Sequence, residues 1–100
     1  MSFLAGEWAE DHAPVVDTYE RVILMKLARH AKDDGTAAYP YVSSLARAAL
    51  CDEETVRRRL RSLQKRKLIA YGDQRLVDHY PASARPKVYD LLIPHEWFSP

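Results

Sequence analysis

The sequence predicts a mostly α-helical domain with a small β-hairpin, in which three helices form the core and two strands follow them. Three segments carry apolar residues at helical spacing, and two short apolar runs, 68–72 and 87–93, come after them. The chain of 100 residues is 47% hydrophobic and 29% charged, which is usual for one globular domain. We therefore assign residues 17–94 to a single domain.

The two ends of the chain lie outside this domain in the prediction. Residues 1–16 form an N-terminal arm. Its large apolar side chains are Phe3, Leu4 and Trp8. Pro14 argues against one continuous helix there, and an apolar arm that covers the core is favoured over a peptide that binds a partner. Residues 95–100 form a C-terminal tail that is expected to pack on the body.

The first core helix is predicted over residues 18–32. Asp17 or Thr18 can cap its start, and Gly35 offers the left-handed conformation that often ends a helix. Its apolar side chains recur at helical spacing and share one face. They are Ile23, Leu24, Leu27, Ala28 and Ala31.

The second core helix is predicted over residues 43–49, after an extended stretch at Tyr39-Pro40. Ser43 or Ser44 can accept a hydrogen bond from the first free amides of this helix. Its inward-facing residues are Leu45, Ala46 and Ala49.

The third core helix is predicted over residues 53–66. Asp52 is a good N-cap, and Glu53 and Glu54 lie in the first turn, where the helix dipole favours negative charge. Lys65, Arg66 and Lys67 follow at the other end, where positive charge is favoured.

One face of this third helix is apolar and the opposite face is basic. Val56, Leu60 and Leu63 share a face at about 100° per residue. The side chains directly opposite that face are Glu54, Arg58, Arg61 and Lys65. The helix is therefore expected to pack on the core with one stripe and to present guanidinium groups with the other.

The connection between the two strands, residues 73–86, is long. "DQRLVDHY" can form a short helix capped by Asp73, and "PASARP" is expected to be loop.

Charge is distributed unevenly along the chain. Residues 47–87 hold eleven Lys and Arg against five Asp and Glu, a balance of +6, and the remainder has a balance of −5. Such a basic segment is typical of a surface that binds a polyanion, although a solvated basic helix face would give a similar pattern.

The stretch "LARAALCDEETVRRRLRSLQKRKLI", residues 45–69, resembles the helix-turn-helix of bacterial winged helix-turn-helix DNA-binding proteins. "ERVILMKLARHAKDDGTAAYP" resembles their first helix and the loop after it, and "VYDLLIP" their last wing strand. The positions that match the motif are Leu45, Ala46, Asp52, Thr55, Val56, Leu60, Leu63, Leu68 and Ile69. The sequence departs from the pattern at Leu50, where glycine is frequent, at Asp52, where serine is usual, and in its long wing loop.

The resemblance implies that residues 53–66 form a recognition helix that enters the major groove of double-stranded DNA. Arg58 would then pair with guanine, and Glu54 and Thr55 would contact bases or the adjacent phosphate. The arginines expected to contact flanking phosphates are Arg57, Arg59 and Arg61.

Further contacts are implied at the second helix and in the wing. Tyr41, Ser43 and Ser44 would bind phosphate through hydroxyl groups and free amides. Arg75, Arg85 and Lys87 are candidates for backbone or minor-groove contact, and the alternative for each is a solvated loop charge.

The function implied is sequence-preferring DNA binding, by a transcriptional regulator or by a replication or mobile-element protein. Binding as a homodimer or by cooperative assembly on DNA is open. The alternative is a winged helix that binds proteins and not DNA, and it predicts binding that survives high salt.

Other classes of function are not expected. The histidines are His12, His30, His79 and His95. None has metal-ligand spacing to Cys51, which is expected to be a buried, inert thiol. We therefore predict no metal, no cofactor and no catalysis. A single cysteine and the lack of a long apolar run favour a cytoplasmic, nucleoid-associated protein without membrane contact.

Overall fold

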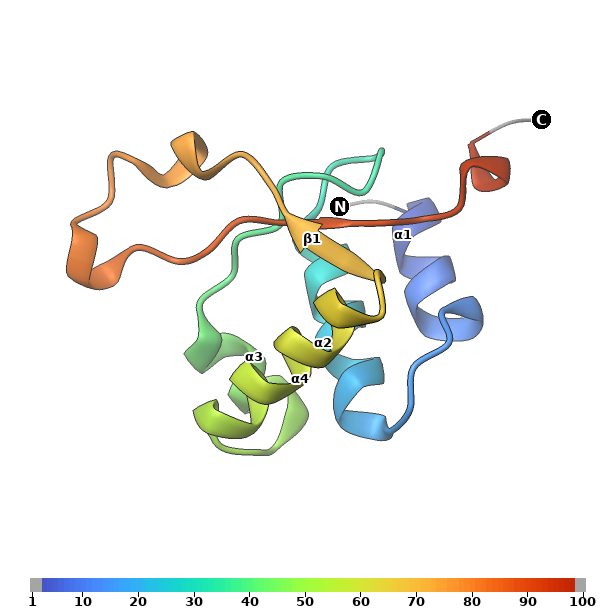
Figure 1. Cartoon of the computed structure of the whole chain (residues 1–100), viewed down its shortest axis with the longest axis horizontal. Helices are drawn as coiled ribbons and strands as arrows, with labels where there is room; N and C mark the ends of the chain where they lie inside the picture. The colour runs from blue at the N-terminus through green and yellow to red at the C-terminus, as the bar shows by residue number, and fades with distance from the viewer. Residues whose placement is uncertain (1–2, 99–100) are drawn as a thin grey trace.

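The protein consists of helices packed around a core, with one short hairpin, as seen in a computed structural model that describes residues 3–98 (Figure 1). The helices are α1 (Phe3–Glu7), α2 (Thr18–His30), α3 (Val42–Ala49) and α4 (Glu53–Lys65), and the strands are β1 (Ile69–Tyr71) and β2 (Tyr89–Leu91). A π-helical turn at Trp8–His12 continues α1, and 3₁₀ turns lie at Gln74–Val77, Ala82–Ala84 and His95–Trp97. Residues 1–2 and 99–100 of the expected arm and tail, and the side chain of Phe3, lie outside the described part.

The predicted fold class is confirmed. The core is formed by α2, α3 and α4, and an antiparallel sheet of two strands covers one end of it. The apolar faces predicted for the three helices are buried, with Ile23, Leu24, Leu27, Val56 and Leu63 fully inaccessible to solvent. This arrangement is consistent with a winged helix-turn-helix.

Helix α2 begins as the sequence predicts and ends two residues earlier. The Asp17 carboxylate caps it by accepting a hydrogen bond from the Glu20 amide at 2.9 Å. Ala31 has extended backbone angles (φ −78°, ψ 159°), so the helix ends at His30 and not at residue 32. Gly35 then adopts a left-handed conformation (φ 88°), and a Cβ there would lie 2.9 Å from Ile93 Cδ1.

The prediction that Ser43 or Ser44 caps α3 is wrong. Tyr41 is the N-cap, and its carbonyl already accepts hydrogen bonds from the amides of Ser44 (3.0 Å) and Leu45 (3.2 Å). The helix therefore begins before either serine, and no side chain caps its first turn.

The turn between α3 and α4 is built on a strained residue. Leu50 adopts the left-handed conformation (φ 55°, ψ 45°), which is why this position often holds glycine, and its side chain is 89% exposed. Asp52 then caps α4 as predicted, since its carboxylate accepts from the Thr55 amide at 2.7 Å. Helix α4 ends at Lys65, one residue before the predicted end.

The hairpin is shorter than the two predicted apolar runs, but its backbone pairing extends beyond the strands. Tyr71 pairs with Tyr89 in register, and the amide of Gly72 donates to the carbonyl of Val88 at 2.9 Å. Ala38, in the extended stretch before α3, exchanges hydrogen bonds with Tyr89 at 2.9 and 2.7 Å. The loop before α3 is thus attached to the outer edge of β2.

The N-terminal segment packs on α2. Trp8, Ala9 and Ala13 are buried in the common core, and the Arg21 guanidinium donates to the carbonyls of Ala9 (2.9 Å) and Ala13 (3.0 Å). The segment ends its helical turns before Pro14, which breaks the helix as expected.

Two ion pairs join α4 to the start of α2. The Glu20 carboxylate is fully buried and is bonded to Arg66, which also donates to the carbonyl of Pro14 at 3.0 Å. Arg59 pairs with Asp17 at 2.9 Å. Because the pairs lie at the middle and at the C-terminal end of α4, about two turns apart on one side, they set how this helix is rotated on the core.

We predict that Arg66→Met lowers the free energy of unfolding by about 3 kcal/mol, because it leaves the buried Glu20 charge unpaired. Adding Glu20→Gln removes that charge, so the double variant should recover more than about 1 kcal/mol of the loss. The matched control is Arg57→Met, whose exposed pair with Glu53 should change stability by less than about 1 kcal/mol. Urea denaturation measures all three, and equal losses for the Arg66 and Arg57 variants would contradict the assignment.

Candidate nucleic-acid interface

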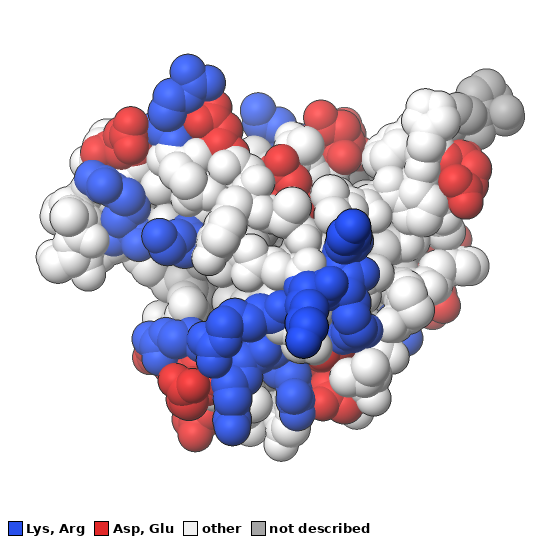
Figure 2. Space-filling view, in the orientation of Figure 1, with Lys and Arg blue, Asp and Glu red and all other residues white. Residues whose placement is uncertain are grey.

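The exposed side of α4 carries a row of basic side chains. Arg57, Arg58, Arg61 and Lys65 are all exposed, while Val56, Leu60 and Leu63 on the opposite side are buried. Figure 2 shows basic side chains in a band over α4 and a second group on the loop between the strands. The N-terminal segment packs on α2 and leaves this face uncovered.

The ion pairs on this face are exposed and therefore weak. Arg57 pairs with Glu53 at 3.1 Å and Arg61 pairs with Glu54 at 3.6 Å, and each of these side chains is about half or more exposed. Exposed pairs of this kind contribute roughly 0.2–1 kcal/mol, so a phosphate can displace the carboxylate. Among the described residues, the Arg58 guanidinium donates a hydrogen bond to the Thr55 hydroxyl at 3.4 Å and interacts with the charge of Asp52.

Arg59 is separated from the other arginines of this helix. Its guanidinium pairs with Asp17 at 2.9 Å and lies 5.9 Å from the centre of the Tyr19 ring. Its side chain is 34% exposed, and its Nε is buried. The expectation grouped Arg59 with Arg57 and Arg61 as phosphate contacts, but the structure directs it toward α2.

A groove runs between α4 and the loop that joins the strands, and several predicted residues meet there. Its first part is a hollow of about 440 Å³. The lining residues are Tyr41, Val42, Ser43, Glu53, Arg57, Ser83, Ala84, Arg85, Pro86 and Lys87. The hydroxyl groups at the start of α3 thus share one hollow with cations from α4 and from the loop.

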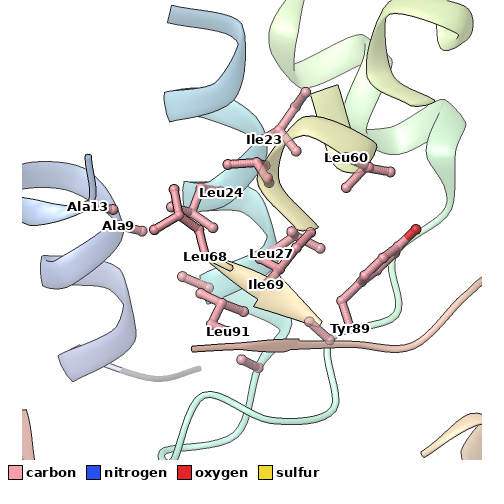
Figure 3. Packing of buried hydrophobic residues seen from close by; sticks show 14 of the residues in the cluster. Ala9, Ala13, Ile23, Leu24, Leu27, Leu60, Leu68, Ile69, Tyr89 and Leu91 are labelled. Atoms are coloured by element: carbon pink, nitrogen blue, oxygen red, sulfur yellow. The ribbon is translucent and has the colours of Figure 1, made fainter. Parts of the chain in front are cut away.

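The second part of this groove is a hollow of about 250 Å³ closer to the hairpin. It is lined by Val42, Arg57, Leu60, Arg61, Gln64, Tyr71, Lys87 and Tyr89. Because Val42, Arg57 and Lys87 line both hollows, we treat them as one feature, the α4–wing groove. Figure 3 shows the Tyr89 ring reaching from β2 toward Leu60 of α4.

The electrostatics of this groove favour an anion. Four cations line it, Arg57, Arg61, Arg85 and Lys87, against one acid, Glu53. Burial, with a smaller contribution from Tyr71, raises the pKa of Tyr89 to about 12. The Tyr89 hydroxyl therefore stays neutral at physiological pH and adds no negative charge.

The loop between the strands, residues 72–88, which we call the wing, is fixed at its base by Gln74. The Gln74 side-chain amide donates to the carbonyls of Gly72 (3.0 Å) and Val88 (2.8 Å) and accepts from the Val88 amide (3.0 Å). Asp73 caps the 3₁₀ turn that follows, as the sequence predicts for a helix at this position. These contacts hold the two sides of the wing together beyond the end of the hairpin.

The two wing arginines differ in their surroundings. Arg85 donates to the carbonyls of Asp78 (3.1 Å) and Tyr80 (2.9 Å), so it shapes the loop as well as lining the groove. Arg75 is 84% exposed and binds both oxygens of Asp73 at 2.9 Å, hydrogen bonds that hold the pKa of that carboxyl below its usual range. Arg75 lines neither hollow of the groove.

Ser44 also stands apart from the groove. Its hydroxyl accepts a hydrogen bond from Arg47 at 3.4 Å, while Ser43 and Tyr41 line the hollow. Arg47 is exposed and lines a separate hollow together with Glu53 of α4.

Gln64, Tyr71 and Gln74 are among the residues of the groove and its base that sequence analysis did not predict as site residues. Gln64 follows Arg57 and Arg61 on the side of α4 that faces the wing, a spacing that could have indicated it. Tyr71 and Gln74 gave no comparable signal, because their partners Tyr89 and Val88 are distant in sequence.

Other kinds of site depend on metal ligands, a reactive thiol or a membrane-spanning helix. Within residues 3–98, no three metal-ligating side chains lie close enough together to hold an ion. Cys51 is half-buried and not buried as expected, and burial, together with Asp52, raises the pKa of its thiol. In the described part of the chain, no helix has both the length and the apolar character needed to cross a membrane.

A family model described as a helix-turn-helix domain matches residues 17–69, from the N-cap of α2 to the first residue of β1. No curated protein and no solved structure matches the chain.

We predict that Gln74→Ala loosens the base of the wing. The amide of Val88 loses its hydrogen-bond acceptor, which lowers the free energy of local opening by about 1 kcal/mol. Hydrogen exchange at this amide should therefore be roughly fivefold faster. Amides in the middle of α4 should exchange at the wild-type rate and serve as the internal control. Unchanged exchange at Val88 would show that Gln74 does not hold the wing.

Proposed function

Because this chain belongs to the helix-turn-helix domain family, we propose that it binds double-stranded DNA with sequence preference by placing α4 in the major groove. The single observation that carries the proposal is the uncovered basic face of α4, rotated outward on a helix whose other side is buried. A helix of this kind fits a major groove roughly 12 Å wide and reads bases from its N-terminal half.

Base contacts are assigned to the first turns of α4. Arg58 is exposed and is held only by a long hydrogen bond to the Thr55 hydroxyl and by the charge of Asp52 among the described residues, so its guanidinium can reach a guanine edge. Glu54 and Thr55 stand beside it and would contact a neighbouring base or phosphate. Arg58 is therefore the proposed determinant of sequence preference.

Phosphate contacts are assigned to the α4–wing groove. Arg57, Arg61 and Lys87 would follow one DNA strand along it, and Tyr41 and Ser43 would contribute hydroxyl groups from the start of α3. Ser44 and the uncapped first turn of α3 would contact the adjacent phosphate.

The remaining predicted residues receive narrower roles. Arg85 would bind the backbone while holding the wing in shape, and Arg75, at the exposed side of the wing, would approach the minor groove. Arg59 would act through its pair with Asp17, which orients α4, and not by direct phosphate contact.

We assign the protein to the bacterial winged helix-turn-helix class. Its proposed role is transcriptional regulation, or DNA binding in replication or in a mobile element. We further propose that it is non-enzymatic, intracellular and associated with the nucleoid. Homodimers and cooperative assembly on DNA are both compatible with this role. A module that binds proteins in place of DNA is not favoured, because the exposed face of α4 presents arginines and not the contiguous apolar patch that marks many protein-binding surfaces.

The proposal predicts steep salt dependence and a specific loss in Arg58→Ala. With about 6–8 phosphate contacts, the logarithm of the affinity should fall with the logarithm of the salt concentration at a slope near about −5 to −7. Arg58→Ala should lose about 1–3 kcal/mol on a duplex selected from a random pool and accept more bases at one position. Fluorescence anisotropy titrations measure both effects.

The control variant is Arg29→Ala, which removes the same charge from the last turn of α2, outside α4 and its groove. It should bind the selected duplex with nearly wild-type affinity. A flat salt dependence would contradict DNA binding by this surface, and wild-type binding by Arg58→Ala would contradict the role of that residue.

A further inference from the structure

Tyr71 is an exposed aromatic side chain that the fold does not require for its core. It lies in β1 and is 59% exposed, whereas Tyr89, its partner in β2, is 7% exposed and belongs to the core. The two rings are stacked, with centroids 5.5 Å apart and an angle of 24° between their planes. Tyr89 thus supports the Tyr71 ring from one side and leaves much of it open to solvent.

The second hollow of the α4–wing groove, beside this ring, combines apolar and polar walls. Val42, Leu60 and Tyr89 provide the apolar surface. Gln64 brings a side-chain amide that can both donate to and accept from a planar ligand, and the cations Arg57, Arg61 and Lys87 complete the lining.

This combination differs from what a phosphate needs. A phosphate group is bound by cations and by hydrogen-bond donors such as amides and hydroxyl groups, and an apolar surface gives it nothing. An aromatic platform, an amide and neighbouring cations are the parts that bind an unpaired nucleotide, with the base stacked and the backbone held by charge. A paired base within a duplex has its faces covered by its neighbours and cannot use the ring.

We propose that Tyr71 stacks an unpaired base in the α4–wing groove, so that the protein prefers a duplex that continues into a single strand. The proposal rests on the proposed DNA binding by α4, since the bound duplex delivers the strand to the groove. The phosphates of that strand lie along Arg57, Arg61 and Lys87, and Gln64 contacts the base edge.

The test compares a blunt duplex, selected from a random pool, with the same duplex carrying a short thymidine overhang on either strand at either end. Stacking of one base on an aromatic ring corresponds to a roughly 5- to 150-fold gain in affinity. The wild-type protein should show such a gain over the blunt duplex for one of these overhangs. Fluorescence anisotropy at a single salt concentration measures the two affinities.

Two variants test whether the Tyr71 ring causes the gain in affinity for the overhang. Tyr71→Ala should lose the gain and keep blunt-duplex affinity within about twofold, because the cations remain. Tyr71→Phe keeps the stacking surface and should keep the gain. A 2-aminopurine at the first unpaired position should be quenched on binding by the wild-type and Phe proteins and not by the Ala protein, and circular dichroism confirms that each variant is folded.

The outcomes separate the two proposals. Equal binding of blunt and extended duplexes by the wild type, or a gain that survives in Tyr71→Ala, overturns the stacking site and leaves duplex binding intact. Failure of the wild type to bind any blunt duplex overturns both.

Discussion

The buried Glu20 carboxylate, bonded to Arg66 across 46 residues of sequence, is the constraint on which the presentation of α4 depends. A fully buried charge must be paired, so Arg66 at the end of α4 is held against the start of α2. Arg59, about two turns earlier, meets Asp17 on the same side of the helix. The apolar stripe of α4 determines which side of this helix is buried. The two ion pairs then fix the rotation of α4 about its axis relative to α2.

The arginines of α4 consequently divide into two groups with different physical roles. Arg59 and Arg66 face protein carboxylates and are about two-thirds covered, so they stabilise the helix in place. Arg57, Arg58 and Arg61 point outward, where their neighbours are exposed and weakly bound. Exposed pairs of this kind are worth so little that they do not compete strongly with a polyanion for the arginines. The wing, held by Gln74, then forms the opposite wall of the groove.

Local patterns predicted most of the fold, whereas contacts between distant segments were not predictable from the sequence. Helix α4 and its cap at Asp52 follow from spacing and helix-end chemistry, which act within a few residues. The role of Arg59 could not be predicted from local patterns. Helical spacing places it between the apolar and the basic face of α4, and its partner Asp17 lies 42 residues away. Tyr71 and Lys87 are brought beside α4 by the hairpin, whose strands pair residues distant in sequence. The start of α3 was misplaced because the Tyr41 carbonyl, and not a serine hydroxyl, begins its hydrogen bonding.

The division of the arginines is the central claim, and the side-chain Nε–H signals of the arginines in nuclear magnetic resonance test it most directly. On titration with a selected duplex, the signals of Arg57, Arg58 and Arg61 should shift, while Arg59 and Arg66 keep the positions they have in the free protein. Shifts confined to Arg59 and Arg66, or to residues outside α4 and its groove, would contradict the account.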